Sequence, residues 1–290
     1  LPISIFIMVP RAQASADRIN EVLDEKIGIH DPENPKTVSF AGKNATLAFN
    51  HVNYRYHGAE KLALEDIDFQ AKSGEIVAII GGTGSGKTSL VNLIPRLYDI
   101  ESGSIQINGT DISDMTQYNL RELMGFVPQK AVLFSGTIRD NMQYGKPDAT
   151  DEMIWKALEI AQAKDFVSEM EDGLDSHVEQ GGGNFSGGQR QRLAIARALV
   201  KTADIYVFDD SFSALDFKTD ANLRQALKTN MKESITVLVA QRVSTVMDAD
   251  MILVLDEGKL VGKGTHEELL ATNETYQEIV HSQLREEDLA

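Results

Sequence analysis

Hydrophobic and polar positions follow two patterns along this chain, and each predicts a different kind of strand. Positions 47–54, 67–69 and 105–107 alternate between apolar and polar residues, which is typical of half-buried antiparallel strands. Unbroken apolar runs occupy positions 76–80, 205–208 and 235–239. Such runs favour parallel strands that are covered on both faces. We therefore expect an α/β fold with a parallel central sheet and a small antiparallel sheet near its start.

Helical spacing of apolar residues marks other parts of the chain. From Asp151 to Met170 the apolar positions recur with a helical period, which predicts a helical insertion between the first two central strands. Residues 251–255 and 260–261 flank a glycine-containing turn and predict a terminal hairpin. From His266 onward the chain is acidic and has the pattern of a helix.

A phosphate-binding motif follows the first central strand. Residues 81–88 satisfy the pattern G-x-x-x-x-G-K-[ST], and a helix-like segment comes directly after them. In this context glycine-rich backbone turns N–H groups toward a phosphate, Lys87 adds a positive charge and the Thr88 hydroxyl can ligate Mg²⁺. The predicted nucleotide site comprises Gly81, Gly82, Thr83, Gly84, Ser85, Gly86, Lys87, Thr88 and Ser89.

A second anchor for the metal is expected after another buried strand. Asp209 follows the run 205–208 directly, at the strand end where ligands bind in α/β sheets. An acidic residue at such a place can also be only a helix cap. Its position downstream of the phosphate motif favours the metal role, so we expect Thr88 and Asp209 to hold Mg²⁺ together.

Composition narrows the classes of partner. The chain has 28 basic and 44 acidic side chains and a formal net charge of −16, which repels nucleic-acid backbones. We therefore expect no nucleic acid as a partner. The chain contains no cysteine, which excludes disulfides and thiolate metal sites.

A further glycine-containing motif lies between the phosphate motif and Asp209. It reads Ser186-Gly187-Gly188-Gln189 and follows Phe185. Together these motifs resemble the nucleotide-binding domain of an ATP-binding cassette (ABC) exporter of the multidrug or lipid type, and the resemblance extends from about residue 46 to 285. It implies ATP and Mg²⁺ as cofactors and a P-loop NTPase core over residues 36–285. The core would carry an N-terminal antiparallel β subdomain and a helical signature subdomain at about 128–198.

The resemblance also implies roles for single residues. Tyr56 matches the aromatic residue that stacks on adenine, and Gln129 matches the glutamine that senses the metal and the γ-phosphate. The signature, residues 186–189, opens a helix in this family and approaches the γ-phosphate held by the opposite subunit. Two such domains must pair head to tail around two ATP molecules, so dimerisation is part of the implied mechanism.

The chain departs from the family at two positions tied to hydrolysis. Asp210 stands where a glutamate usually orients the attacking water, and Gln241 stands where a histidine is usual. Asp210 is one methylene shorter than glutamate, and a displacement of about 1 Å can lower a rate about a hundredfold. Gln241 can still donate a hydrogen bond, but it lacks the charge and second nitrogen of an imidazole. We expect Asp210, Gln241 and Gln129 to form a catalytic set that binds ATP better than it hydrolyses it.

These departures suggest the degenerate half of a heterodimeric exporter. Its intact signature would complete the hydrolytic site of a second ABC half-transporter. The rival interpretation is a homodimeric exporter with slow turnover. Two alternatives from other classes remain, a soluble ABC ATPase that acts on DNA or ribosomes and a non-catalytic ATP-binding module.

The first 35 residues are interpreted as the end of a last membrane helix and a linker, because such a helix runs directly into this domain in the resembling exporters. Residues 1–10 are apolar but reach only about half the length that spans a bilayer. The alternative is a buried amphipathic terminal helix. Prolines in the segment 31–35 are typical of a linker. The domain would then lie at the cytoplasmic face of the cell membrane, attached to its own transmembrane domain, with residues 286–290 as an acidic tail.

Overall fold

The computed structural model describes residues 2–25 and 28–287 and divides the chain into two compact units, residues 1–31 and 32–290. The first unit contains helix α1 (Pro2–Leu23), whose side chains from residue 6 onward are exposed. No helix in the described parts of the chain has the length and hydrophobicity needed to cross a bilayer. Residue 1 of the expected membrane-helix end and residues 288–290 of the expected acidic tail lie outside the described residues.

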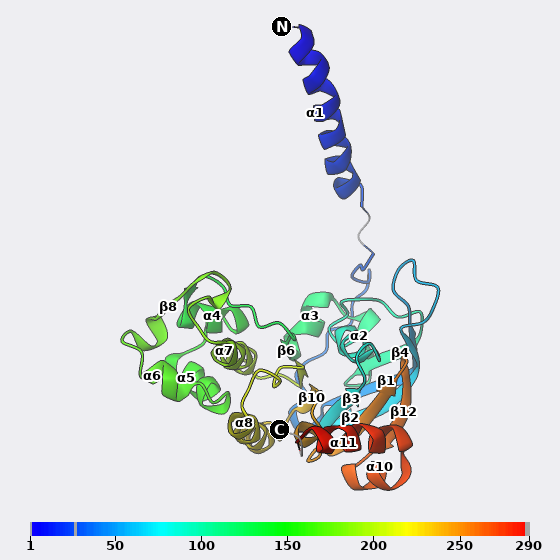
Figure 1. The fold of residues 1–290 in the computed structure, drawn as a ribbon, viewed down its shortest axis with the longest axis vertical. Coiled ribbons are helices and arrows are strands. Elements are labelled where there is room, and N and C mark those ends of the chain that lie inside the picture. The colour runs from blue at the N-terminus through cyan, green and yellow to red at the C-terminus, as the bar shows by residue number, and fades with distance from the viewer. Residues whose placement is uncertain (1, 26–27, 288–290) are drawn as a thin grey trace. The chain divides into compact units, whose positions relative to one another are not determined.

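Ten strands of the second unit form one sheet in the order β5-β4-β1-β2-β12-β11-β3-β10-β9-β6 (Figure 1). The strands in chain order are β1 (Thr46–Tyr54), β2 (Leu64–Lys72), β3 (Ile76–Gly81), β4 (Ser102–Ile107), β5 (Thr110–Asp111), β6 (Met124–Val127), β9 (Ile205–Asp209), β10 (Ile235–Val239), β11 (Met251–Asp256) and β12 (Lys259–Gly264). Strands β3, β10 and β9 run parallel to one another, which confirms the predicted central sheet. Strands β11 and β6 extend it in parallel on either side, which the sequence did not predict. A second, two-stranded sheet pairs β7 (Gly136–Thr137) with β8 (His177–Val178).

The antiparallel strands do not form the separate small sheet that the sequence suggested. β1 pairs antiparallel with β2 and β4 as expected. However, β2 also lies beside β12, where Lys259 pairs with Glu65, and β12 forms the expected hairpin with β11. The hairpin therefore joins the antiparallel strands to the parallel core.

Helices cover the sheet and extend one end of the domain. They are α2 (Lys87–Leu93), α3 (Gln117–Glu122), α4 (Ile138–Gly145), α5 (Asp151–Ile160), α6 (Lys164–Ser168), α7 (Gly187–Leu199), α8 (Phe217–Asn230), α9 (Val243–Val246), α10 (His266–Thr272) and α11 (Glu274–Glu287). Helix α7 contacts α4 and α5, and in Figure 1 these three helices lie on the left, away from β1 and β4. This arrangement is the expected helical insertion.

The insertion differs from its prediction in one respect. The helical pattern from Asp151 to Met170 is broken, because α5 ends at Ile160 and Gln162 has a left-handed backbone with a φ of 58°. Helix α6 then begins at Lys164. Ala161 and Ala163 on either side of the break are buried, so the turn keeps the apolar face of the insertion continuous.

Three hydrophobic clusters fix the sheet edge that carries the predicted site. One joins the antiparallel strands to α2, and includes Phe49 and Phe69 stacked with ring centroids 4.7 Å apart. A second lies under the helical insertion. The third packs Ala78 and Ile80 of β3 against α11. Because β3, β6, β9 and β10 are parallel, their carboxyl ends meet at one edge, and the loops that follow them are brought together there.

Candidate nucleotide site

The phosphate motif forms a tight loop between β3 and α2. Gly86 has a φ of 103° and immediately precedes α2, a backbone conformation that favours glycine. A Cβ on Gly81 would lie within 2.1 Å of the carbonyl oxygen of Leu255, so only glycine fits at the start of the loop. Lys87 Nζ donates to the carbonyl oxygens of Gly81 and Gly82 at 2.8 and 2.7 Å. Burial lowers the pKa of Lys87, which is the expected response of a cation held in a partly buried pocket.

A cavity of about 390 Å³ opens beside this loop. Its lining brings the predicted residues together: Gly81, Gly82, Thr83, Gly84, Lys87, Thr88, Gln129, Asp209, Asp210 and Gln241. A Cβ added at Gly82 or Gly84 would meet nothing within 4 Å, so the backbone is open to the cavity at both positions. The cavity and its half-buried ammonium group therefore fit the phosphates of a nucleotide.

Two buried carboxylates form the floor of the cavity. Asp209 and Asp210 are 3% and 7% exposed at the end of β9. Burial raises the pKa of Asp209, an effect that the hydrogen bond from Thr88 opposes and the neighbouring Asp210 reinforces. Thr88 Oγ1 lies 3.2 Å from Asp209 Oδ1, so the hydroxyl and the carboxylate are placed to share one Mg²⁺ ion. Among the described residues no group of three or more His, Cys, Asp or Glu could hold a metal ion.

Two side-chain amides converge on one oxygen of Asp210. Gln241 Nε2 donates to Asp210 Oδ2 at 2.6 Å, and Gln129 Nε2 donates to the same atom at 3.3 Å. Burial raises the pKa of Asp210, and the two amide hydrogen bonds act in the opposite direction. Asp210 also has a left-handed backbone with a φ of 47°, which is uncommon outside glycine. The three residues expected to be catalytic thus lie in direct contact.

Tyr56 lies beside the phosphate loop but does not line its cavity. Its hydroxyl group lies 2.8 Å from Ser89 Oγ, next to the start of α2. The ring packs edge to face against Tyr54 and Tyr98, with centroids 4.9 and 5.4 Å away, and the side chain stays 39% exposed. The aromatic surface is therefore held in place while part of it is open to a ligand. Tyr98 was not recognised from the sequence, because it lies outside any motif.

The signature motif lies elsewhere on the domain. Ser186 caps α7 and forms a capping box with Gln189, in which each side chain accepts from the other residue's backbone N–H. None of the residues 186–189 lines the phosphate cavity, and Ser186 and Gly187 are exposed. Phe185, which precedes the motif, is buried in the cluster under the insertion. The cavity and the signature are thus separate surfaces of one chain.

Comparison with known proteins decides the family. A family profile described as "ABC transporter" matches residues 64–213. An uncharacterized ABC transporter ATP-binding protein of Mycobacterium tuberculosis is 45% identical over 279 residues, which cover 95% of this chain and 47% of that protein. The chain belongs to the ABC transporter family.

Other relatives and one solved structure agree with this ABC assignment. An ATP-dependent lipid A-core flippase of Desulfotalea psychrophila is 41% identical over 95% of this chain and 47% of its own length. The structure of a bacterial Atm1-family ABC exporter with ATP bound matches with a TM-score of 0.86 and 33% identity, over 96% of this chain and 48% of that chain. This chain spans about half the length of the curated relatives it matches. The α/β ABC ATPase fold is confirmed, and ABC transporter ATP-binding domains are ATPases coupled to transport.

Sequence reasoning missed part of the wall of the ABC nucleotide site. Ile279, Ser282 and Gln283 of α11 also line the phosphate cavity. No motif marks them, and they lie about 70 residues beyond Asp210 in the chain. The only sequence signal was the helical pattern of the last segment, which does not say what the helix packs against.

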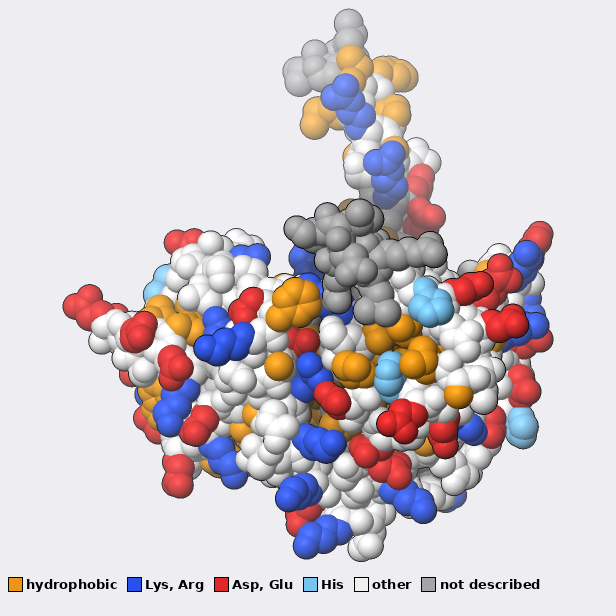
Figure 2. All heavy atoms as spheres, turned by 60° about the horizontal axis from the view of Figure 1, so that its bottom comes forward, with side chains coloured by type: hydrophobic (Ala, Val, Ile, Leu, Met, Phe, Trp, Pro, Cys, Tyr) orange, Lys and Arg blue, Asp and Glu red, His pale blue; other side chains and the backbone are white. Residues whose placement is uncertain are grey.

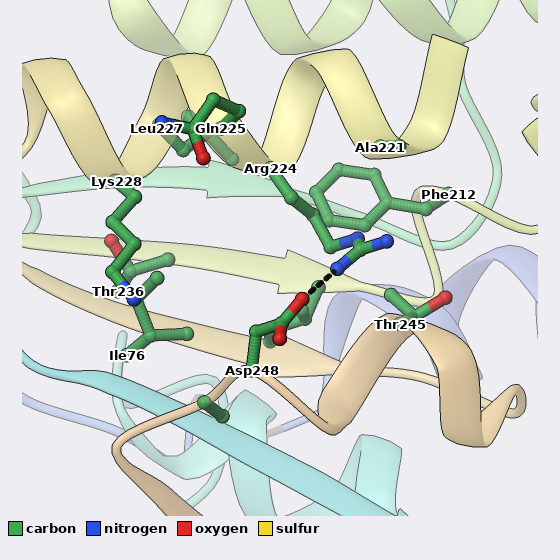
Figure 3. A pocket seen from close by; sticks show the side chains of 12 residues that line it. Ile76, Phe212, Ala221, Arg224, Gln225, Leu227, Lys228, Thr236, Thr245 and Asp248 are labelled. Carbon is green, nitrogen blue, oxygen red and sulfur yellow. Dashed lines mark hydrogen bonds and ion pairs between the residues drawn. The ribbon is translucent and has the colours of Figure 1, made fainter. Parts of the chain in front are cut away.

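A second cavity, of about 350 Å³, lies between α8, β10 and the loop before β11 (Figure 3). Two of its lining residues form an ion pair with one another, Arg224 and Asp248 at 2.9 Å, and Arg224 also lies 3.5 Å from the buried Asp220. None of the predicted nucleotide-binding residues lines it. The predicted residues gather instead at the cavity beside the phosphate loop.

Proposed function

We propose that this chain is the ATP-binding domain of an ABC exporter and uses Mg-ATP to drive a transmembrane domain. The observation that carries the proposal is the cavity in which the phosphate loop, Thr88 and Asp209 meet. In this site Lys87 would bind the β- and γ-phosphates, and Thr88, Asp209 and Gln129 would hold the Mg²⁺ ion. The ion would supply charge neutralisation at the phosphates when bound. Tyr56 would carry the adenine ring.

We further propose that this site hydrolyses ATP slowly. The carboxylate of Asp210 has to reach the attacking water from a side chain one methylene shorter than that of glutamate. The hydrogen bonds from Gln241 and Gln129 also direct its Oδ2 atom toward those amides. A carboxylate held in this way is less available as a base, and the pair of amides supports nucleotide binding without supplying a proton acceptor.

The partner is the third part of the proposal. The signature cap at Ser186 is intact and exposed, and it is separate from the chain's own phosphate cavity. It is therefore available to complete the ATP site of another subunit. We propose a heterodimer in which the partner carries the usual glutamate and histidine, because two copies of this chain would form two slow sites. A homodimer with slow turnover is the second candidate.

The length of the exporter relatives and the surface charge of this chain support an exporter over a soluble ABC ATPase. We propose that residues 1–35 lead to the transmembrane domain, since the exporter relatives are about twice as long as this chain. On the face drawn in Figure 2, acidic and basic side chains are interspersed and form no continuous basic stripe. That face and the net charge of −16 offer no continuous basic surface for a nucleic-acid backbone.

The test compares Mg-ATP turnover by the unaltered protein and by the double variant Asp210→Glu, Gln241→His. ATP affinity is measured for both, and Lys87→Ala serves as the control for contaminating ATPase activity. We expect equal affinity and a turnover at least about a hundredfold higher in the double variant. Brisk hydrolysis by the unaltered protein would remove the case for a degenerate site and favour the homodimer. Adding candidate partners to the unaltered protein then tests the heterodimer, because its signature should raise their turnover.

A further inference from the structure

The C-terminal helix α11 is fixed firmly against the core of the domain. Tyr276 is fully buried and Val280 is almost so, in the hydrophobic cluster that also contains Ala240 and Val243. The Tyr276 hydroxyl lies 2.8 Å from His266 Nδ1, which ties α11 to α10. These contacts place the helix beside the loop that carries Gln241.

One side chain of α11 connects the helix to that loop. Gln283 lies seven residues after Tyr276 and three after Val280, so all three share one face of the helix. Its Oε1 accepts from the backbone N–H of Val243 at 2.7 Å, and its Nε2 donates to the backbone oxygen of Gln241 at 2.7 Å. A single amide group thus binds the main chain on both sides of Arg242.

One of these two hydrogen bonds replaces a local cap. Val243 is the first residue of α9, and Arg242 before it provides no side-chain hydrogen bond to the helix. The N–H groups of a first helical turn have no partner within the helix. Gln283 therefore satisfies one of them from a point 40 residues further along the chain.

The same loop contacts the rest of the nucleotide site. Gln241 donates to Asp210, and Arg242 reaches the backbone oxygens of Ser213 and Leu215 at 3.3 and 3.4 Å. Ser213 itself donates to the backbone oxygen of Asp210 at 2.9 Å. A shift of the loop at Gln241 would thus change both the hydrogen bond to Asp210 and the segment that follows it.

We infer that Gln283 is a positioning residue for ATP hydrolysis, which fixes the loop 240–243 so that the side chain at position 241 meets Asp210 and the γ-phosphate. The inference rests on the proposed role of position 241. Because Gln283 binds only backbone atoms of the loop, its role is independent of whether residue 241 is glutamine or histidine. If α11 were displaced, the loop 240–243 would lose these hydrogen bonds and become less firmly held.

The experiment replaces Gln283 with methionine, which has similar length and no amide group. Gln277→Met is the matched control, because Gln277 lies on the same helix and its amide donates to the Leu270 backbone oxygen, away from the site. Both changes are made in the Asp210→Glu, Gln241→His protein, where turnover is measurable. We expect Gln283→Met to lower kcat about tenfold with KM for ATP within about twofold, and Gln277→Met to change neither. Equal kcat in the two variants would overturn the inference.

A second readout does not depend on turnover. Amide hydrogen exchange at Val243 in the otherwise unaltered protein should become about tenfold faster in Gln283→Met and stay unchanged in Gln277→Met. Gln283→Glu keeps an acceptor for Val243 but loses the donor to Gln241, so it should retain most of the protection at Val243 while kcat still falls. Unchanged exchange in Gln283→Met would refute the proposed contact. If the Gln283 effects appear but the unaltered protein hydrolyses ATP briskly, only the degenerate-site proposal fails.

Discussion

Asp204 provides the most direct test of how the two parts of the sheet are held together. It is fully buried immediately before β9. Its carboxylate accepts hydrogen bonds from the backbone N–H groups of Ala41 and Gly42 at 3.0 Å and from Asn108 Nδ2 at 2.6 Å. Asn108 belongs to the turn between β4 and β5, so this one side chain links the antiparallel strands to the start of a parallel strand.

The expected loss of folding stability in Asp204→Ala follows from these contacts. Three donors would be left without an acceptor, and each costs about 1–2 kcal/mol, which gives a total of about 3–6 kcal/mol. With an m-value of roughly 3 kcal/mol/M for a protein of this size, the urea midpoint should fall by about 1–2 M. Asp204→Asn should lose less stability, since one oxygen can still accept from Ala41 and Gly42. Its side-chain NH₂ group would face the NH₂ group of Asn108, so that hydrogen bond would be lost. Asn108 cannot turn its amide around to restore it, because Asn108 Oδ1 accepts from the N–H of Thr46.

Urea unfolding followed by circular dichroism measures the effect. Asp148→Ala is the control, because that carboxylate is exposed and pairs with the nearby Lys146, so its midpoint should shift by less than about 0.3 M. The expected order of stability is unaltered protein, then Asp204→Asn, then Asp204→Ala. A midpoint for Asp204→Ala within about 0.3 M of the unaltered protein would show that the buried carboxylate does no more than replace water at these donors.

Three further predictions concern the nucleotide site. Lys87→Ala removes the only ammonium group that lines the cavity within the described chain, so ATP affinity measured by calorimetry should fall about 10- to 100-fold. Because burial raises the pKa of Asp209, its protonated form, which cannot ligate Mg²⁺, persists to higher pH than in an ordinary aspartate. The Mg²⁺-dependent part of ATP affinity should therefore decline as pH falls through that raised pKa, and Asp209→Asn should abolish this dependence in titrations at several pH values. Ser186→Ala should cost about 1 kcal/mol of helix stability and leave the chain's own ATP affinity unchanged. It should reduce the chain's ability to stimulate the ATPase activity of a partner. Equal stimulation by the variant and the unaltered protein would contradict the role of the signature.

The order and type of the main elements could be predicted because local pattern specifies them. Alternating and continuous apolar runs distinguished antiparallel from parallel strands, and the phosphate motif identified its own strand-to-helix context. The break at Gln162 was missed because a short turn with buried alanines on both sides keeps the hydrophobic period intact. The pairing of β2 with β12 was missed because a sheet contact between distant segments leaves no local signal.

For the candidate site, too, some features could be predicted from the sequence and others could not. The sequence alone predicted which residues would carry the chemistry, since Lys87, Thr88 and Asp209 lie in motifs whose spacing has a physical cause, and its resemblance to the family marked Asp210 and Gln241 as departures. Only the tertiary structure decided that Gln129 and Gln241 meet on one oxygen of Asp210. It also decided that Gln283 of α11 binds the backbone of the loop 240–243. These contacts join residues 31 to 81 positions apart, and their geometry depends on parallel strands that end at one edge of the sheet. Local pattern encodes the elements, whereas long-range packing sets the distances on which catalysis depends.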